Sequence, residues 1–349
     1  MILVAVMAAA LWGIGAFMGT PRGPRFVLLG VLFGAVLFVQ LALPDGHPLR
    51  MATGGEPALW LLIAGFGVVI WAYRAGLGWL RGRVGPDQPV APTRPGAFSD
   101  TELGRYARHI TLREIGGPGQ KALRDARVLV VGAGGLGSPA LQYLAAAGVG
   151  TIGIIDDDLV ENANLARQVI HADAMIGTPK VMSAMAAMMA QNPFVTVRPY
   201  QRRLTADIAA DLFADYDLIL EGSDNFETRY LVNATAVALD KPVIAAALTQ
   251  WEGQISVYDP ARGAPCYACV FPVAPDRALV PTCAEAGVLG PLPGVMGAMM
   301  AVEAVKLITG AGEGLRGRLL IYDALYAEVR IIGVKRNPDC LVCGATPSP

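Results

Sequence analysis

The stretch RVLVVGAGGLGSPALQYLAAAGVGTIGIID, from Arg127 to Asp156, decides the fold of this chain. It opens with a short β-branched run that is typical of a strand buried on both faces, and this run leads directly into a glycine-rich turn. The segment SPALQYLAAAG then has the pattern of a helix, and TIGIID has that of a second strand. This order of strand, glycine turn, helix and strand is the context that a nucleotide-binding fingerprint requires. We therefore expect a Rossmann-like unit with a nucleotide at its glycine turn.

The glycine spacing indicates how a nucleotide would bind. Gly132, Gly134 and Gly137 allow a tight turn, a close approach of backbone to phosphate, and close packing of helix on strand. Gly135 belongs to the same loop, and Asp156 ends the next strand, about the ~20 residues on where a ribose hydroxyl is usually bound. Taken alone, the pattern indicates a nucleotide such as NAD or FAD, and only the rest of the chain can decide whether the loop binds ATP instead. A glycine turn without a ligand is the simpler alternative.

The segments around this stretch predict the rest of an α/β domain. Ser99 and Glu102 have the spacing of a capping box, so a helix should start there. After Asp156, helix-like and strand-like segments alternate as far as Leu248, which predicts a doubly wound, mostly parallel sheet. Beyond Trp251 the pattern changes to GQISVYD, a cysteine-containing loop, a helix and two strand-like pieces. We expect these to form an antiparallel C-terminal extension of the sheet.

The N-terminal part of the chain has a different character. The chain is 54% hydrophobic, which is more than an ordinary soluble enzyme carries, and the excess lies in residues 1–80. Three apolar runs, at about 1–19, 26–43 and 59–80, each approach the ~20 residues that cross a bilayer. We therefore expect three transmembrane helices within a membrane anchor of residues 1–84. A signal peptide followed by buried core helices is the alternative.

Basic residues predict the orientation of this anchor. Arg22 and Arg25 lie between the first two runs, and Arg81 and Arg83 follow the third. The positive-inside rule then places the N-terminus outside and everything after Leu80 in the cytoplasm, so we expect a multi-pass protein of the inner membrane. The net charge of -1 gives no indication of nucleic-acid binding.

The remaining chain divides in two. Residues 85–98 are rich in proline and glycine and are typical of a linker, and residues 99–349 form the expected catalytic domain.

Polar residues after the fingerprint favour a triphosphate. Asn164, Arg167 and Lys180 follow the ribose position closely. Lys180 comes after Thr178 and Pro179, an expected N-cap and first-turn pair, so its charge is unfavourably placed at a helix N-terminus unless an anion binds there. Each of these residues taken alone could be a solvated surface residue.

Asp224 ends another apolar strand, in the sequence EGSDN. The carboxyl edge of an open α/β sheet is where such folds bind ligands, and a carboxylate there can hold Mg²⁺ beside phosphates. A helix N-cap is the alternative role for Asp224.

The cysteines indicate a metal. Cys266 and Cys269 form one CxxC pair, and Cys340 and Cys343 form another, which together supply four thiolates for one tetrahedral Zn²⁺ site. Redox-active or unrelated thiols are the alternative. Cys283 remains outside this set and is either inert or a candidate nucleophile.

The motifs together resemble the ThiF/MoeB/HesA family of E1-like adenylyltransferases, and most of all its MoeB branch. The resemblance covers about residues 100–349 and is carried, in order, by RYARHITL, GAGGLG, the strand that ends at Asp156, NLARQ, GTPK, SDN, CYAC, TCAEAG and CLVCG. It implies that the nucleotide is ATP. It further implies that the chain adenylates the C-terminal glycine of a ubiquitin-like sulfur carrier and releases pyrophosphate, before thiocarboxylate formation in molybdenum cofactor biosynthesis.

The resemblance also implies roles for single residues. The glycine loop would bind the ATP phosphates, Asp156 the ribose, and Asp224 a Mg²⁺ ion. Asn164, Arg167 and Lys180 would contact the phosphates. Arg108 would reach the active site of a partner subunit, which implies a homodimer, although His109 replaces the glutamine usual in that segment. Cys283 matches a loop cysteine that bonds covalently to the carrier in some relatives.

The sequence leaves three other functions open. A ThiF-like enzyme would adenylate the thiamine-pathway carrier instead. An NAD- or FAD-dependent oxidoreductase could use the same glycine fingerprint, and a membrane scaffold could merely bind a carrier. The sequence ends shortly after CLVCG, so we expect a separate sulfurtransferase or desulfurase to donate the sulfur.

Overall fold

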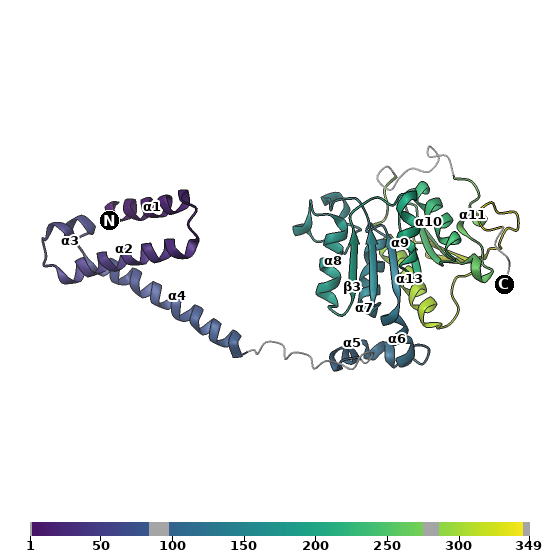
Figure 1. The fold of residues 1–349 in the computed structure, drawn as a ribbon, viewed down its shortest axis with the longest axis horizontal. Coiled ribbons are helices and arrows are strands. Elements are labelled where there is room, and N and C mark those ends of the chain that lie inside the picture. The colour runs from purple at the N-terminus through teal and green to yellow at the C-terminus, as the bar shows by residue number, and fades with distance from the viewer. Residues whose placement is uncertain (1, 84–97, 275–285, 345–349) are drawn as a thin grey trace. The chain divides into compact units, whose positions relative to one another are not determined.

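The chain forms two compact units, Met1–Pro95 and Gly96–Pro349 (Figure 1). The computed structural model describes residues 2–83, 98–274 and 286–344. Cys283 and all but the last residue of the predicted linker 85–98 lie outside these ranges.

The first unit is helical. Its helices are α1 (Ile2–Phe17), α2 (Arg22–Ala42), α3 (Pro48–Thr53) and α4 (Pro57–Arg83). By length and composition, Gly23–Ala42 and Pro57–Gly76 could cross a membrane, and only 11% and 6% of these windows are buried. Helix α1 has 16 residues, so it is shorter than the predicted run of about 1–19 and than the ~20 residues of a spanning helix, and its membrane crossing stays a prediction.

Helix α3 was not predicted from the sequence. It starts where the His47 side chain accepts a hydrogen bond from Leu49 N at 3.3 Å, and it ends at Gly54, whose φ of 131° leaves the helical region. Gln40 Nε2 on α2 donates to Thr53 Oγ1 at 2.7 Å. These polar contacts fix a short turn that the apolar pattern does not reveal.

The second unit is built on one sheet of eight strands in the order β3-β2-β1-β4-β5-β6-β7-β8. The first five strands in this order are parallel, and β6, β7 and β8 continue the sheet antiparallel. The strands are β1 (Arg127–Val131), β2 (Thr151–Ile155), β3 (Thr196–Tyr200), β4 (Leu218–Glu221), β5 (Val243–Leu248), β6 (Glu252–Tyr258), β7 (Arg318–Asp323) and β8 (Glu328–Gly333). The predicted mostly parallel sheet with an antiparallel C-terminal extension is confirmed.

Helices cover both faces of this sheet (Figure 1). In β1, Val128 and Val130 belong to one core cluster, with α7, α8 and α13, while Leu129 and Val131 belong to the other, with α9 and α10. This alternation follows from the two-residue period of a strand. The helices are α5 (Asp100–Ile110), α6 (Gly116–Asp125), α7 (Gly137–Ala147), α8 (Lys180–Gln191), α9 (Ala206–Ala214), α10 (Phe226–Ala238), α11 (Tyr267–Val270) and α13 (Pro291–Thr309).

Two of these helices need comment. Helix α13 is long and apolar enough to cross a membrane, but 44% of it is buried and it packs in the core against α7 and the sheet, so it is a core helix.

Helix α5 begins with the predicted capping box, in which Glu102 N donates to Ser99 Oγ at 3.2 Å and Ser99 N donates to Glu102 Oε2 at 2.8 Å. Its Tyr106 hydroxyl accepts a hydrogen bond from Asn192 Nδ2 at 2.8 Å, which joins α5 to the end of α8.

Candidate nucleotide site and cysteine cluster

The glycine loop lies at the point where the strand order of the sheet reverses. Successive strands run outward from β1 to β3, and the chain then returns to place β4 on the other side of β1. The loops after β1 and β4 therefore meet: a Cβ added at Gly132, whose φ is +94°, would lie 3.2 Å from Gly222 O. A Cβ at Gly137 would collide with Gly132 O. This reversal is where open α/β sheets bind ligands.

Gly134 differs from these packing glycines. A Cβ added there would find its nearest neighbour, Gln168 Nε2, at 3.8 Å, which is an ordinary contact. Among the described residues, no acceptor takes the N–H of Gly134. Helix α7 begins just beyond with no side-chain cap, although its first residues, Gly137 and Ser138, are buried. An uncapped helix start and a free N–H are what a phosphate group needs, so the loop fits a nucleotide.

Asp156 lies against this loop, at the carboxyl end of β2. Its Oδ2 accepts a hydrogen bond from Ala133 N and its Oδ1 one from Asp158 N, both at 2.8 Å. Burial raises the pKa of Asp156, and these hydrogen bonds and the charge of Lys180 oppose the rise. The carboxylate thus sits at the expected position, and its contact with ribose stays a prediction.

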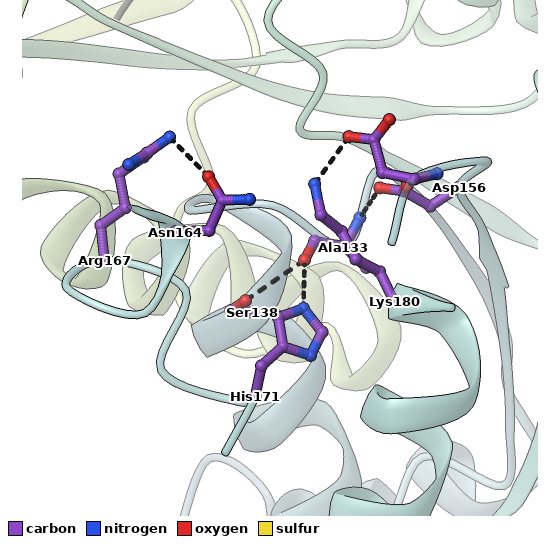
Figure 2. A network of polar contacts seen from close by, with 8 residues as sticks. Ala133, Ser138, Asp156, Asn164, Arg167, His171 and Lys180 are labelled. Carbon is purple, nitrogen blue, oxygen red and sulfur yellow. Dashed lines mark hydrogen bonds and ion pairs between the residues drawn. The ribbon is translucent and has the colours of Figure 1, made fainter. Parts of the chain in front are cut away.

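Lys180 brings a positive charge to the same edge (Figure 2). It is the first residue of α8, and the N-cap is Pro179 without a side-chain hydrogen bond, so the expected cap at Thr178 is wrong by one residue. The Lys180 Nζ lies 2.7 Å from Asp158 Oδ2, and the lysine side chain is 6% exposed while that of the aspartate is 65% exposed. A buried ammonium at a positive helix end is favourable only with anions beside it.

Asn164 and Arg167 approach Ala133 from the other side (Figure 2). Asn164 ends a short 3-10 turn and is buried, and its Oδ1 accepts a hydrogen bond from Arg167 Nη2 at 3.1 Å. The Arg167 Cγ is 3.8 Å from where a Cβ of Gly135 would lie. The structure therefore gathers Asn164, Arg167, Lys180 and Asp156 around one loop, as the sequence predicted.

Asp224 lies in the loop after β4 and is exposed. The N-cap of α10 is its neighbour Asn225, whose side chain accepts a hydrogen bond from Thr228 N at 2.8 Å, so the alternative role of Asp224 as a cap is wrong. Asp224 therefore remains an exposed residue of the loop whose Gly222 contacts Gly132.

The sequence did not predict the residues that hold the loop after β4. Glu221, the last residue of β4, is buried, and its Oε1 accepts a hydrogen bond from Ser223 N at 2.8 Å. Arg229 on α10 lies 3.1 Å from Glu221 Oε2 and donates to Ser223 O at 2.7 Å. Burial raises the pKa of Glu221 and the Arg229 guanidinium opposes the rise. The only sequence signal was a charge at the end of an apolar strand.

The structure does not bring two of the predicted site residues to the glycine loop. Arg108 is exposed on α5, and within the described residues its side chain has no hydrogen bond or ion pair. Cys283 lies outside the described residues.

The remaining four cysteines lie together. Cys266 and Cys269 flank the start of α11, and Cys340 and Cys343 come from the C-terminal segment. The sulfur separations are 3.8 Å for Cys266–Cys269, 3.7 Å for Cys266–Cys340 and 3.4 Å for Cys269–Cys343. A tetrahedron with Zn–S bonds of about 2.3 Å has sulfurs about 3.8 Å apart, so the cluster fits Zn²⁺.

The surroundings of the cysteines support the same fit. The backbone N–H of Asn337 points to Cys269 Sγ at 3.4 Å, and a Cβ at Gly344 would collide with Cys340 O, so the tight turn needs this glycine. Burial raises the pKa of the Cys266 and Cys269 thiols. Burial acts in the same sense on Cys340, but hydrogen bonds from the N–H groups of Cys343 and Val342 and from the Cys266 and Cys269 thiols together bring that pKa to about 7.

Comparison with known proteins shows which family the chain is similar to. The ThiF family matches residues 106–342. The sulfur carrier protein adenylyltransferase of Thermus thermophilus is 49% identical over 255 residues, which are 72% of this chain and 94% of that protein. The probable adenylyltransferase/sulfurtransferase MoeZ of Mycobacterium tuberculosis is 50% identical over 246 residues, 70% of this chain and 63% of that protein. The chain thus spans less than two thirds of the length of this second relative.

The fold also has relatives among solved structures. The crystal structure of E. coli MccB with MccA-N7isoASN aligns with a TM-score of 0.61 and 24% identity, over 69% of this chain and 74% of that one. That likeness concerns the fold alone. The family match and the two sequence relatives confirm the predicted E1-like adenylyltransferase family, and the chain belongs to the ThiF family.

Proposed function

We propose that the chain uses ATP to adenylate the C-terminal glycine carboxylate of a ubiquitin-like sulfur carrier, with release of pyrophosphate. The observation that carries this proposal is the buried Lys180 ammonium at the start of α8, beside a glycine loop whose Gly134 N–H is free among the described residues. The relatives named as sulfur carrier adenylyltransferases supply the kind of substrate.

The proposed reaction does not require a general base from the protein. A carboxylate is already a nucleophile, so the site must bring two anions together and stabilise charge on phosphorus as pyrophosphate leaves. Lys180 and Arg167 supply positive charge on opposite sides of Ala133, and the loop N–H groups and the α7 N-terminus hold the phosphates. Mg²⁺, when bound, would neutralise phosphate charge, and Asp224, exposed in the loop after β4, would hold it.

The cysteine cluster has a structural role in this proposal. Four thiolates complete a tetrahedral Zn²⁺ site and leave no position open for substrate. The ion would join residues 340–343 to the start of α11, as the separations between the sulfurs allow.

Several finer assignments belong to the same proposal. The carrier is the small subunit of molybdopterin synthase, with the thiamine-pathway carrier as the alternative, and a separate protein donates the sulfur. The chain acts as a homodimer in which Arg108 reaches the partner's site. The first unit anchors the protein in the inner membrane with the second unit in the cytoplasm, which the two long apolar helices support. Cys283 takes part in sulfur transfer.

Intact-mass spectrometry of candidate carriers tests the proposal. Each purified carrier is incubated with the full-length protein, ATP and Mg²⁺. We expect an AMP adduct on the molybdopterin-type carrier. An adduct confined to the thiamine-type carrier would move the assignment to that pathway, and no adduct on any carrier, with folded and metal-loaded protein, would refute adenylation.

A further inference from the structure

His171 is a buried side chain that the proposed chemistry does not use. It is 7% exposed and lies between the glycine loop and α8. Its Nε2 is 3.0 Å from Ala133 O (Figure 2), and its Nδ1 is 2.9 Å from Ser183 Oγ. Ser183 belongs to the same helix as Lys180, so one imidazole bridges the loop and the helix that carries the buried ammonium.

The chemistry of these partners fixes the tautomer. A carbonyl oxygen can only accept, so Nε2 must carry the hydrogen. Burial lowers the pKa of His171 below its usual value; the hydrogen bond to Ala133 opposes this shift and the Lys180 charge supports it. The ring is therefore mainly neutral at pH 7, and Nδ1 accepts from the Ser183 hydroxyl.

The bond to Ala133 has a geometric consequence for the next residue. In a planar trans peptide, the C=O of Ala133 and the N–H of Gly134 point in opposite directions. An Ala133 carbonyl held toward His171 therefore turns the Gly134 N–H away from His171, where no described residue accepts it. Ser138 Oγ also donates to the Ala133 carbonyl, at the longer distance of 3.4 Å, so the His171 bond at 3.0 Å is the shorter of the two. Glycine permits many backbone conformations, so loss of the His171 bond would leave this peptide held by the longer Ser138 contact alone. The other side of Ala133 is held as well, because its N–H donates to Asp156.

We propose that His171 is a positioning residue for the phosphate loop: its Nε2–H holds the Ala133 carbonyl so that the Gly134 N–H is presented to the phosphates of ATP. The inference rests on the proposed function only in taking ATP as the nucleotide. It needs no carrier protein.

Comparison of ATP with adenosine binding tests the inference, with the full-length protein and isothermal titration calorimetry. In His171→Asn the side-chain amide can reach only the Nδ1 position, whereas in His171→Gln it can place an N–H near the Nε2 position. We expect ATP affinity to fall about tenfold in His171→Asn, the order of one well-placed hydrogen bond, and to stay within about threefold of wild type in His171→Gln. Adenosine affinity should change little in either variant. Equal losses for ATP and adenosine, or equal ATP affinity in both variants, would overturn the role.

A measurement on the unmodified protein keeps the test valid if a variant fails to fold. The chain has three histidines, His47, His109 and His171, so nitrogen NMR of protein labelled at histidine gives few signals. We expect the buried ring to be the neutral tautomer with hydrogen on Nε2, and its Nε2 signal to shift on addition of ATP. A hydrogen on Nδ1, with Nε2 bare, would refute the proposal. Absence of carrier adenylation would refute the proposed function but not this inference, whereas absence of ATP binding by wild type would overturn both.

Discussion

The second unit holds two sites, which differ in how many of their polar or ligand groups have partners within the protein. At the glycine loop, polar groups lack protein partners: the Gly134 N–H is free among the described residues, and α7 starts without a side-chain cap. In the cysteine cluster, all four ligand atoms lie within 4.8 Å of one another and three of the four residues are buried. The first arrangement suits a ligand that enters and leaves, and the second suits a resident ion. Disruption of the first should therefore impair catalysis, and disruption of the second should impair folding.

Lys180→Met should show the largest effect of a change at the glycine loop, with activity lost and stability kept. Removal of a preorganised charge at the phosphates should lower the adenylation rate by about 100-fold or more. The melting temperature should stay near that of wild type, because the substitution removes a buried charge and keeps an apolar stem. Carrier adenylation followed by mass spectrometry, together with a thermal melt, measures both.

Asp158→Asn is the matched control, because Asp158 is the exposed partner in the ion pair with Lys180. It should cost less than about tenfold in rate, as solvent screens an exposed carboxylate. A rate near wild type in Lys180→Met would contradict the assignment of the open site.

Cys343→Ser should have the opposite signature. Loss of one thiolate opens the metal site, so bound zinc should fall below one per chain and the melting temperature should drop by about 5 °C or more. Metal analysis and a thermal melt test this prediction.

Leu341 lies between the two C-terminal cysteines and is fully exposed, which makes Leu341→Ser a control that should retain both zinc and stability. Full stability of Cys343→Ser with zinc absent would show that the cluster does not support the fold.

Asp224 and Asn225 are adjacent, and substitutions of the two should separate an effect on metal binding from an effect on stability within one loop. Asp224→Asn should raise the Mg²⁺ concentration needed for half-maximal activity by about tenfold, since a neutral amide is a poorer ligand than a carboxylate. Asn225→Ala should leave the Mg²⁺ requirement unchanged and cost about 1 kcal/mol in unfolding free energy, because it removes the N-cap of α10. An unchanged Mg²⁺ requirement in the first variant would remove Asp224 from the metal site.

Removal of the first unit should have the smallest effect. A chain that starts at Ser99, the N-cap of α5, keeps the capping box and every residue of both sites, so we expect it to be soluble and to adenylate carrier at the wild-type rate. Size-exclusion chromatography and the adenylation assay decide this. Aggregation of the zinc-loaded truncated chain would show that the first unit is part of the fold of the second.

The sequence predicted what depends on local pattern. Strand and helix periods gave the sheet, and fixed spacings gave the glycine loop and the cysteine cluster. It did not predict residues that act through distant partners. His171 meets Ala133, and Arg229 meets Ala246, only after the chain folds, over separations that no short motif encodes. Glu221 lies near Arg229 in the sequence, but the charges alone do not reveal that the two pair in the interior. Helix α6 and the short helix α3 were missed for a related reason, since neither has an apolar repeat long enough to detect.

Carrier-dependent exchange of labelled pyrophosphate into ATP tests the central claim most directly, because it reports reversible attack of the carrier carboxylate at the open site. The account predicts exchange with a carrier that has its C-terminal glycine carboxylate free, none with the same carrier amidated at that position, and at least a 100-fold reduction in Lys180→Met. Exchange that proceeds without carrier, or at an equal rate with the amidated carrier, would contradict it.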